Sequence, residues 1–149
     1  PRGVRASVPL WYSALTHATS ALVAITILVG IITTGSGPHA GDSGASRNGL
    51  DSELLQHVHS WPAYATVAAT VLLLIGALRL GQPRLARFTG ILLAIEAVQV
   101  AVGLAQARLG LPEILVGAHM VLACCLAAAM TAVVLSLREP VASAVDAEK

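Results

Sequence analysis

Long apolar runs follow one another along the chain, and the polar residues gather mainly between these runs. A helix needs about 20 apolar residues to cross a hydrocarbon core of about 30 Å. Four runs reach that length, at about residues 8–33, 52–80, 88–107 and 112–137. The pattern predicts an all-α, integral membrane protein in which residues 1–149 form one antiparallel four-helix bundle.

The segments between the runs are consistent with this order. Residues 81–84 (GQPR) and 108–112 (RLGLP) are short, so the helices that they join should be antiparallel. Asp51 or Ser52 can cap the second helix, and Pro62 then falls inside it, where proline removes a backbone hydrogen bond. Residues 34–51 are rich in Gly, Ser and Asp and exceed the length of a simple link, which predicts a functional loop.

Composition supports a membrane location, and the basic residues indicate an orientation. Of the 149 residues, 56% are hydrophobic and only 11% are charged. If the helices alternate in direction, Arg47 and Arg108 lie on one side of the membrane. The other basic residues then share the opposite side: Arg2, Arg5, Arg79, Arg84, Arg87, Arg138 and Lys149. Because cytoplasmic segments carry the excess of Lys and Arg, both termini should be cytoplasmic and the 34–51 loop extracytoplasmic.

The same dispersed charges bear on possible partners. No run of basic residues interleaves with aromatic residues, which excludes nucleic acid and leaves the lipid bilayer as the expected surrounding.

The chain opens with Pro1, and its first apolar run is too long for a signal peptide and lacks a small-residue cleavage site. We therefore expect the chain to be part of a longer protein.

Ionisable residues inside membrane spans are costly, so they are the first candidates for a functional site. The second and fourth helices both run inward from the outer side, and equal offsets from their starts therefore lie at equal depths. His59 and His119 each lie seven residues from a helix start, at a depth of about 10 Å. Two imidazoles at one depth on parallel helices predict a haem bound between them.

His57 is the alternative to His59 in this pair. The two side chains point about 200° apart on a helix, so only one of them can face the bundle axis. Each histidine also has a structural interpretation, in which it hydrogen-bonds a neighbouring carbonyl or lies at the membrane interface. A zinc site from His39, His57 and His59 is a weaker possibility, because no carboxylates cluster beside them. The sequence indicates no catalytic residue.

The third helix carries a polar stripe, made of Glu96, Gln99, Gly103 and Gln106. These residues fall within one sector of about 80° and should face inward. The stripe can join helices by hydrogen bonds, with the glycine allowing close approach, or it can conduct protons beside a cofactor.

Other polar residues in the spans favour structural roles. Ser13, His17 and Ser20 form a similar stripe on the first helix, at a different depth from the histidine pair. Cys124 and Cys125 diverge by about 100° on the fourth helix, which is typical of packing residues.

Four segments of the chain are distinctive: TGSGPHAGD (34–42), HSWPAY (59–64), VQVAVGLAQ (98–106) and LGLPEILVGAHM (109–120). Together they resemble bacterial haem A synthase, in particular the C-terminal half of the actinobacterial type. The resemblance covers nearly the whole chain, and the glycine-rich loop and the LPE…AH segment are its most specific parts.

The resemblance implies a function. In that family, two four-helix halves form an eight-helix enzyme of the bacterial plasma membrane, which oxidises a methyl group of haem O to the formyl group of haem A. The C-terminal half holds a haem b cofactor, with His119 and His59 here as the implied iron ligands. Ser60 stands where the family commonly has Arg, which leaves His57 open as the alternative. Residues 36–42 would cap the pocket or meet the haem propionates.

The resemblance also implies partners. The N-terminal half, with the substrate haem site and its catalytic carboxylate, has no counterpart in this chain, so the isolated chain should be inactive. A haem-O-binding N-terminal half is the implied partner, with haem O synthase and cytochrome oxidase assembly proteins beyond it. Two other functions stay open: a membrane b-type cytochrome for electron transfer, and a cofactor-free membrane assembly subunit.

Overall fold

The structure is a computed structural model that describes residues 4–6, 8–38 and 46–140. It contains four helices: α1 (Leu10–Ser36), α2 (Ser52–Arg79), α3 (Pro83–Arg108) and α4 (Glu113–Leu135). Each is long and apolar enough to cross a membrane. For the described residues, the predicted helical class is therefore confirmed, with four helices that are each able to span a membrane.

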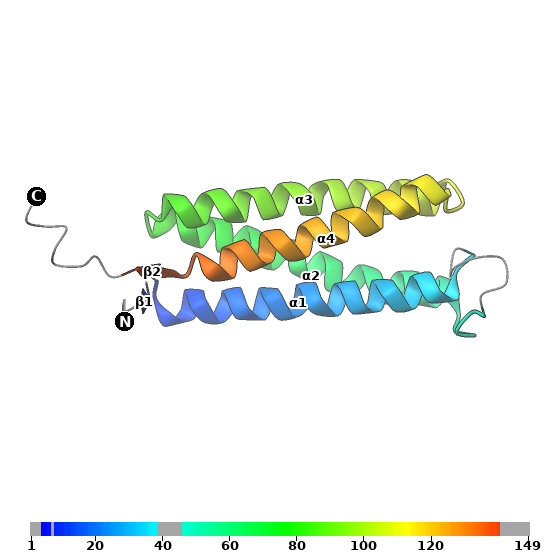
Figure 1. The fold of residues 1–149 in the computed structure, drawn as a ribbon, viewed down its shortest axis with the longest axis horizontal. Helices are drawn as coiled ribbons and strands as arrows, with labels where there is room; N and C mark the ends of the chain where they lie inside the picture. Colours follow the sequence, from blue (N-terminus) through cyan, green and yellow to red (C-terminus); the bar gives the residue numbers. More distant parts are fainter. Residues whose placement is uncertain (1–3, 7, 39–45, 141–149) are drawn as a thin grey trace, which may run out of the picture.

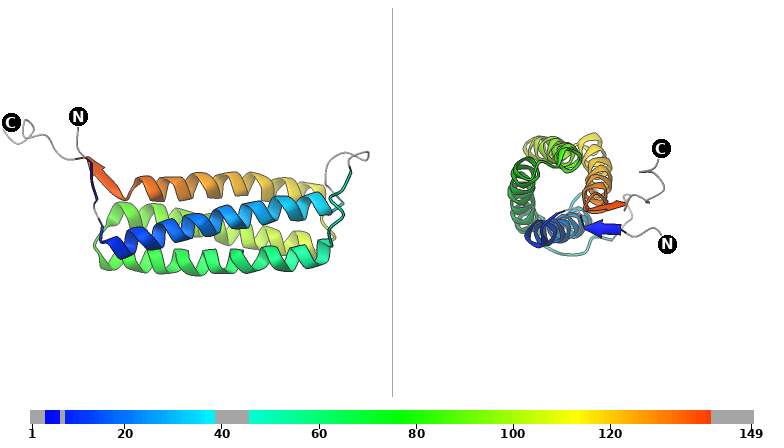
Figure 2. Two further views of the ribbon diagram at one scale, coloured as in Figure 1. Left: turned by 90° about the horizontal axis from the view of Figure 1, so that it is seen from below. Right: turned by 90° about the vertical axis from the view of Figure 1, so that its left-hand side faces the viewer.

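The four helices lie side by side around a common axis, and consecutive helices run in opposite directions (Figures 1 and 2). Each helix packs on its neighbour in sequence, and α1 also contacts α4. In Figure 1, α4 and α1 diverge toward the end of the bundle that is opposite the chain termini.

Two helix ends differ from the prediction. α1 continues to Ser36, so residues 34–36 are helical rather than part of the loop. Thr34 Oγ1 donates to the carbonyl of Gly30, one turn back, which satisfies this polar side chain within the helix. α3 begins at Pro83 rather than near residue 88. Proline is favourable in a first helical turn because its missing N–H would have no partner there.

The start of α2 is fixed by a side-chain cap. Asp51 Oδ1 accepts hydrogen bonds from the backbone N–H groups of Glu53 at 2.9 Å and Leu54 at 3.1 Å. These are donors that an uncapped helix start would leave without partners. Pro62 lies inside α2, which continues through it to Arg79.

A short antiparallel pair of strands, β1 (Val4–Ala6) and β2 (Arg138–Pro140), joins the two ends of the chain. Val4 pairs with Pro140 and Ala6 with Arg138. The apolar pattern does not predict these strands. They place the beginning of α1 and the end of α4 together at one end of the bundle (Figure 1).

Apolar packing is concentrated in the half of the bundle that is nearest the strands. One buried cluster contains Tyr12, Leu73, Ala77, Leu85 and Leu137. A second contains Val23, Leu92, Leu126, Met130 and Val133. All four helices contribute to these clusters, which therefore close this half of the bundle and leave the other half as the place for a cavity.

Candidate functional site

His59 on α2 and His119 on α4 face each other in the half of the bundle opposite the strands. Their ring centroids are 6.3 Å apart, and the ring planes are inclined by 76°. Both residues are half-buried. In each ring, Nδ1 is buried and has no hydrogen-bond partner among the described residues. The structure thus brings together His59 and His119, the two histidines that the sequence analysis expects at the same depth.

Glycines on the two remaining helices make room for these rings. A Cβ atom at Gly30 of α1 would lie 3.0 Å from Cε1 of His59. A Cβ atom at Gly103 of α3 would lie 3.2 Å from Cε1 of His119. Each ring therefore packs directly against the backbone of a neighbouring helix, which limits its rotation. Of these two glycines, the sequence pattern singled out only Gly103.

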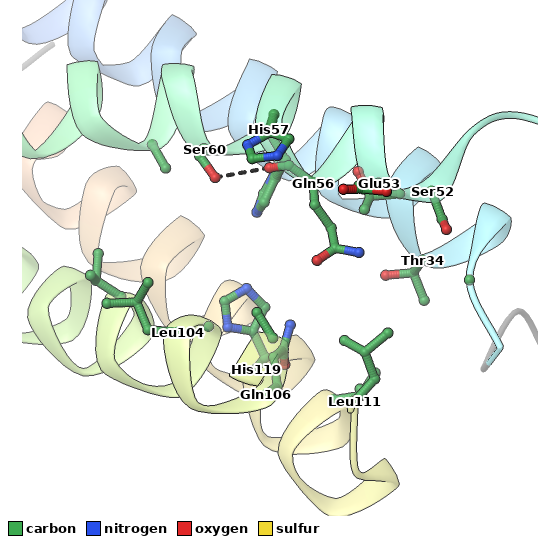
Figure 3. A pocket seen from close by; sticks show the side chains of 18 of the residues that line it. Thr34, Ser52, Glu53, Gln56, His57, Ser60, Leu104, Gln106, Leu111 and His119 are labelled. Atoms are coloured by element: carbon green, nitrogen blue, oxygen red, sulfur yellow. Dashed lines mark hydrogen bonds between the residues drawn. The ribbon is translucent and has the colours of Figure 1, made fainter. Parts of the chain in front are cut away.

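A cavity of about 480 Å³ contains the pair and is lined by all four helices and the residues after α1. Its volume lies in the range of cofactor sites, which is about 300–1,000 Å³. Figure 3 shows His57 and Ser60 on one side of the cavity, facing Leu104 and His119 on the other. Polar residues of the α2 start, among them Ser52, also line it.

The spacing of the rings can be compared with the spacing that a shared metal requires. A bond from a metal to an imidazole nitrogen is about 2.0 Å long and the ring centroid lies about 1.1 Å further, so two rings across one metal have centroids about 6 Å apart. The observed separation of 6.3 Å matches this value. The free Nδ1 atoms, the small residues behind the rings and the cavity volume are also compatible with a haem.

The other histidines have different surroundings. His57 is exposed but also lines the same cavity. His17 is exposed on the outside of α1 and is not part of the cavity lining. His39 lies outside the described residues, as does the loop over 39–45. Within the described ranges, no three His, Cys, Asp or Glu side chains converge on a metal site.

The polar stripe of α3 faces inward. Glu96 is buried, with 3% of its surface exposed, and its Oε1 accepts a hydrogen bond of 2.8 Å from Thr70 Oγ1 on α2. Gln99 Nε2 donates to the backbone carbonyl of His119 at 3.2 Å, so the stripe contacts one member of the histidine pair through a hydrogen bond between α3 and α4. Gln106 lines the cavity, and its Oε1 is buried without a partner in the described part of the chain.

Some residues of this region carry no signal in the sequence. Thr70 is one of many threonines in the spans, and only the packing of α2 on α3 brings it to Glu96. Cys124 and Cys125, for which the sequence predicted a packing role, are free and exposed on α4 and do not line the cavity.

Comparisons of the chain with protein-family models, with curated proteins and with solved structures each gave no match.

Proposed function

We propose that this chain is the haem b-binding half of a haem A synthase, an oxidoreductase of the bacterial plasma membrane that converts haem O to haem A. The observation that carries the proposal is the His59–His119 pair, with ring centroids 6.3 Å apart beside a cavity of about 480 Å³. The resemblance of the four quoted segments to that family supports the choice of reaction.

Each part of the site has a role in this proposal. His59 and His119 would hold the haem iron, and His57 remains the alternative to His59. Gly30 and Gly103 let the neighbouring helices press on the rings, which fixes the ring orientations and excludes water. When bound, haem b supplies one-electron transfer.

The proposal includes a topology and a set of partners. The termini lie in the cytoplasm, on the side with most of the basic residues, and the histidine pair lies toward the outer surface. A separate or covalently linked N-terminal half binds haem O and provides the oxidation site. Haem O synthase and cytochrome oxidase assembly proteins are the further partners.

Absorption spectra of the purified chain test haem binding. The protein is prepared in detergent with haem available, and spectra are recorded in the oxidised and reduced states. Wild type should show sharp low-spin b-type bands, and His59→Ala and His119→Ala should lose them. His17→Ala is the matched control, because His17 is a span histidine exposed outside the site. Bands that survive both substitutions in the pair would contradict the proposed ligands.

His57→Ala resolves the alternative ligand. Retention of the bands in His57→Ala and their loss in His59→Ala supports His59. The reverse result assigns the ligand to His57.

A membrane b-type cytochrome is the second candidate, and the same pair favours it. A haem held by both histidines would have no iron site left for a substrate, as is typical of electron-transfer haems. Co-expression with an N-terminal half in cells that make haem O separates the two functions. Haem A that accumulates only with wild-type chain supports the synthase, whereas a bound b haem without any haem A supports the cytochrome. A colourless wild-type protein would favour the cofactor-free subunit.

A further inference from the structure

Glu96 is a buried carboxyl group whose hydrogen bonding is incomplete. It lies on α3 with 3% of its surface exposed, and Thr70 Oγ1 donates to its Oε1 at 2.8 Å. Its Oε2 is also buried and has no hydrogen-bond partner among the described residues. The polar stripe in the sequence predicts that Glu96 faces inward. Haem ligation by the two histidines does not explain why a carboxyl group is buried at this position.

Among the described side chains, no cation within the bundle balances this carboxyl group. In the described part of the chain, the arginines that flank the spans are exposed and lie at or beyond helix ends: Arg47, Arg79, Arg84, Arg87, Arg108 and Arg138. Besides Glu96 itself and the charged residues near the helix ends, which are Glu53, Glu113 and the arginines, the titratable residues within the spans are Tyr12, His17, His57, His59, Tyr64, His119, Cys124 and Cys125. Each of these is neutral or a histidine, so an ionised Glu96 would be an uncompensated charge in a membrane interior.

The protonated form of Glu96 also lacks a complete set of hydrogen-bond partners. Thr70 already uses its hydroxyl hydrogen toward Oε1, so a proton on Oε2 would be a donor without an acceptor in the described residues. Both protonation states therefore lack one partner. A change of charge nearby can then decide which state prevails.

On α3, Gln99 lies between Glu96 and Gly103, and it is hydrogen-bonded to His119. It lies three residues beyond Glu96 on α3, where side chains on one helix face are neighbours at about 5–6 Å between Cβ atoms. Its Nε2 donates to the carbonyl of His119, while its Oε1 is buried without a partner among the described residues. Neither Glu96 nor Gln99 is among the residues that line the cavity, and Glu96 lies about one helical turn from Gln99.

We propose that Glu96 is a proton-exchanging site, coupled to the charge of the cofactor that His59 and His119 hold; the coupling rests on the proposed function. Reduction by an external one-electron donor adds one negative charge to the pocket. The Glu96 carboxylate then takes one proton from water, forming one O–H bond, and the net charge of the site is unchanged. Oxidation releases the electron to an external acceptor and the proton to water.

Infrared difference spectra of the haem-loaded protein, reduced minus oxidised, test this proposal. We expect a protonated-carboxyl C=O band to appear on reduction and to shift in D₂O. Glu96→Gln should lack the band. Thr70→Val should keep it at a shifted frequency, because this variant retains the carboxyl group and loses only the hydrogen-bond donor. Glu113→Gln, which alters an exposed carboxyl group at the start of α4, should leave the band unchanged.

The haem midpoint potential provides a second readout. For one proton coupled to one electron, it should fall by up to about 59 mV for each tenfold decrease in proton concentration over the range in which Glu96 titrates. Glu96→Gln should remove this slope.

The outcomes separate the two proposals. Haem-loaded protein with no carboxyl band, or with a band that survives in Glu96→Gln, overturns the proton site and leaves haem binding intact. Protein without haem bands contradicts the proposed function instead. In that case a pH titration of the haem-free protein decides on Glu96: a pH-dependent carboxyl band missing from Glu96→Gln supports proton exchange, and its absence overturns it.

Discussion

Two glycines determine how closely the neighbouring helices approach the histidine rings. An added methyl group at Gly30 would meet Cε1 of His59 at 3.0 Å, and one at Gly103 would meet Cε1 of His119 at 3.2 Å. Both distances are shorter than ordinary carbon contacts, which are about 3.5–4.0 Å. An added methyl group therefore forces the histidine ring that it meets to move, and this changes the alignment of the two rings.

Alanine at Gly30 or Gly103 should therefore lower haem binding. We expect several-fold less haem per protein and a loss of stability of about 1–3 kcal/mol from overpacking. Haem content from absorbance and thermal unfolding in detergent measure the two effects. Gly90→Ala and Gly117→Ala are matched controls, because an added Cβ there meets nothing within 4 Å. Equal haem loss in all four variants would show that close packing at the rings is not the cause.

The histidine pair also shows what the sequence could predict at this scale. Helix rise fixes depth, so counting from the helix starts brings His59 level with His119. The choice between His59 and His57 depends on which face of α2 turns inward. A helix that is apolar on all sides gives little information about its inward face, because lipid and protein interior favour the same residues. Packing in the structure leaves His57 exposed.

At the scale of the helices, the start of α2 controls the outer wall of the cavity. Asp51 holds the first N–H groups of α2, and Ser52, Glu53 and Gln56 in its first turns line the cavity. Asp51→Ala should cost about 1 kcal/mol and fray this end. Faster hydrogen exchange at the amides of residues 53 and 54 would report the fraying. Asp51→Asn, which keeps an accepting oxygen, should behave like wild type; equal exchange in both variants would contradict the capping role.

The boundaries of helices are where the sequence pattern was least informative. The apolar run marks the hydrocarbon core, but α3 extends five residues before it, through Arg84 and Arg87, which are exposed. α1 likewise extends into Thr34 and Ser36, whose hydroxyls bond to helix carbonyls. Polar turns of this kind belong to the membrane interface, where hydropathy falls although the helix continues. The β1–β2 pairing is non-local, and strands of three residues are too short for an alternation of apolar and polar residues to predict them.

At the scale of the whole molecule, the bundle has a packed end and a hollow end. Both buried clusters lie in the half that carries the strands, and the cavity lies in the other half. A bundle built in this way can keep its helix arrangement while a cofactor enters or leaves. Haem removal should therefore change the helical circular dichroism of the purified protein little. A large loss of helix on haem removal would show instead that the cofactor is needed to hold the bundle together.

The orientation of these two ends in the membrane gives a final prediction. Arg79, Arg84, Arg87 and Arg138 lie at the packed end, whereas Arg47 and Arg108 lie at the hollow end. The excess of basic residues favours a cytoplasmic location for the packed end. The helices contain 23 to 28 residues, and at about 1.5 Å per residue they exceed a hydrocarbon core of about 30 Å. Exposed residues at both ends therefore lie in water, where thiol reagents can reach them.

Cysteine labelling in intact cells measures this orientation. In a background with Cys124 and Cys125 replaced by Ala, Arg47→Cys should react with a membrane-impermeant maleimide. Arg84→Cys should react only after the cells are permeabilised. The two variants are matched, because each replaces one exposed arginine outside the hydrocarbon core. The reverse pattern would put the histidine pair on the cytoplasmic side, and the proposed function would then require its partner half in the opposite orientation.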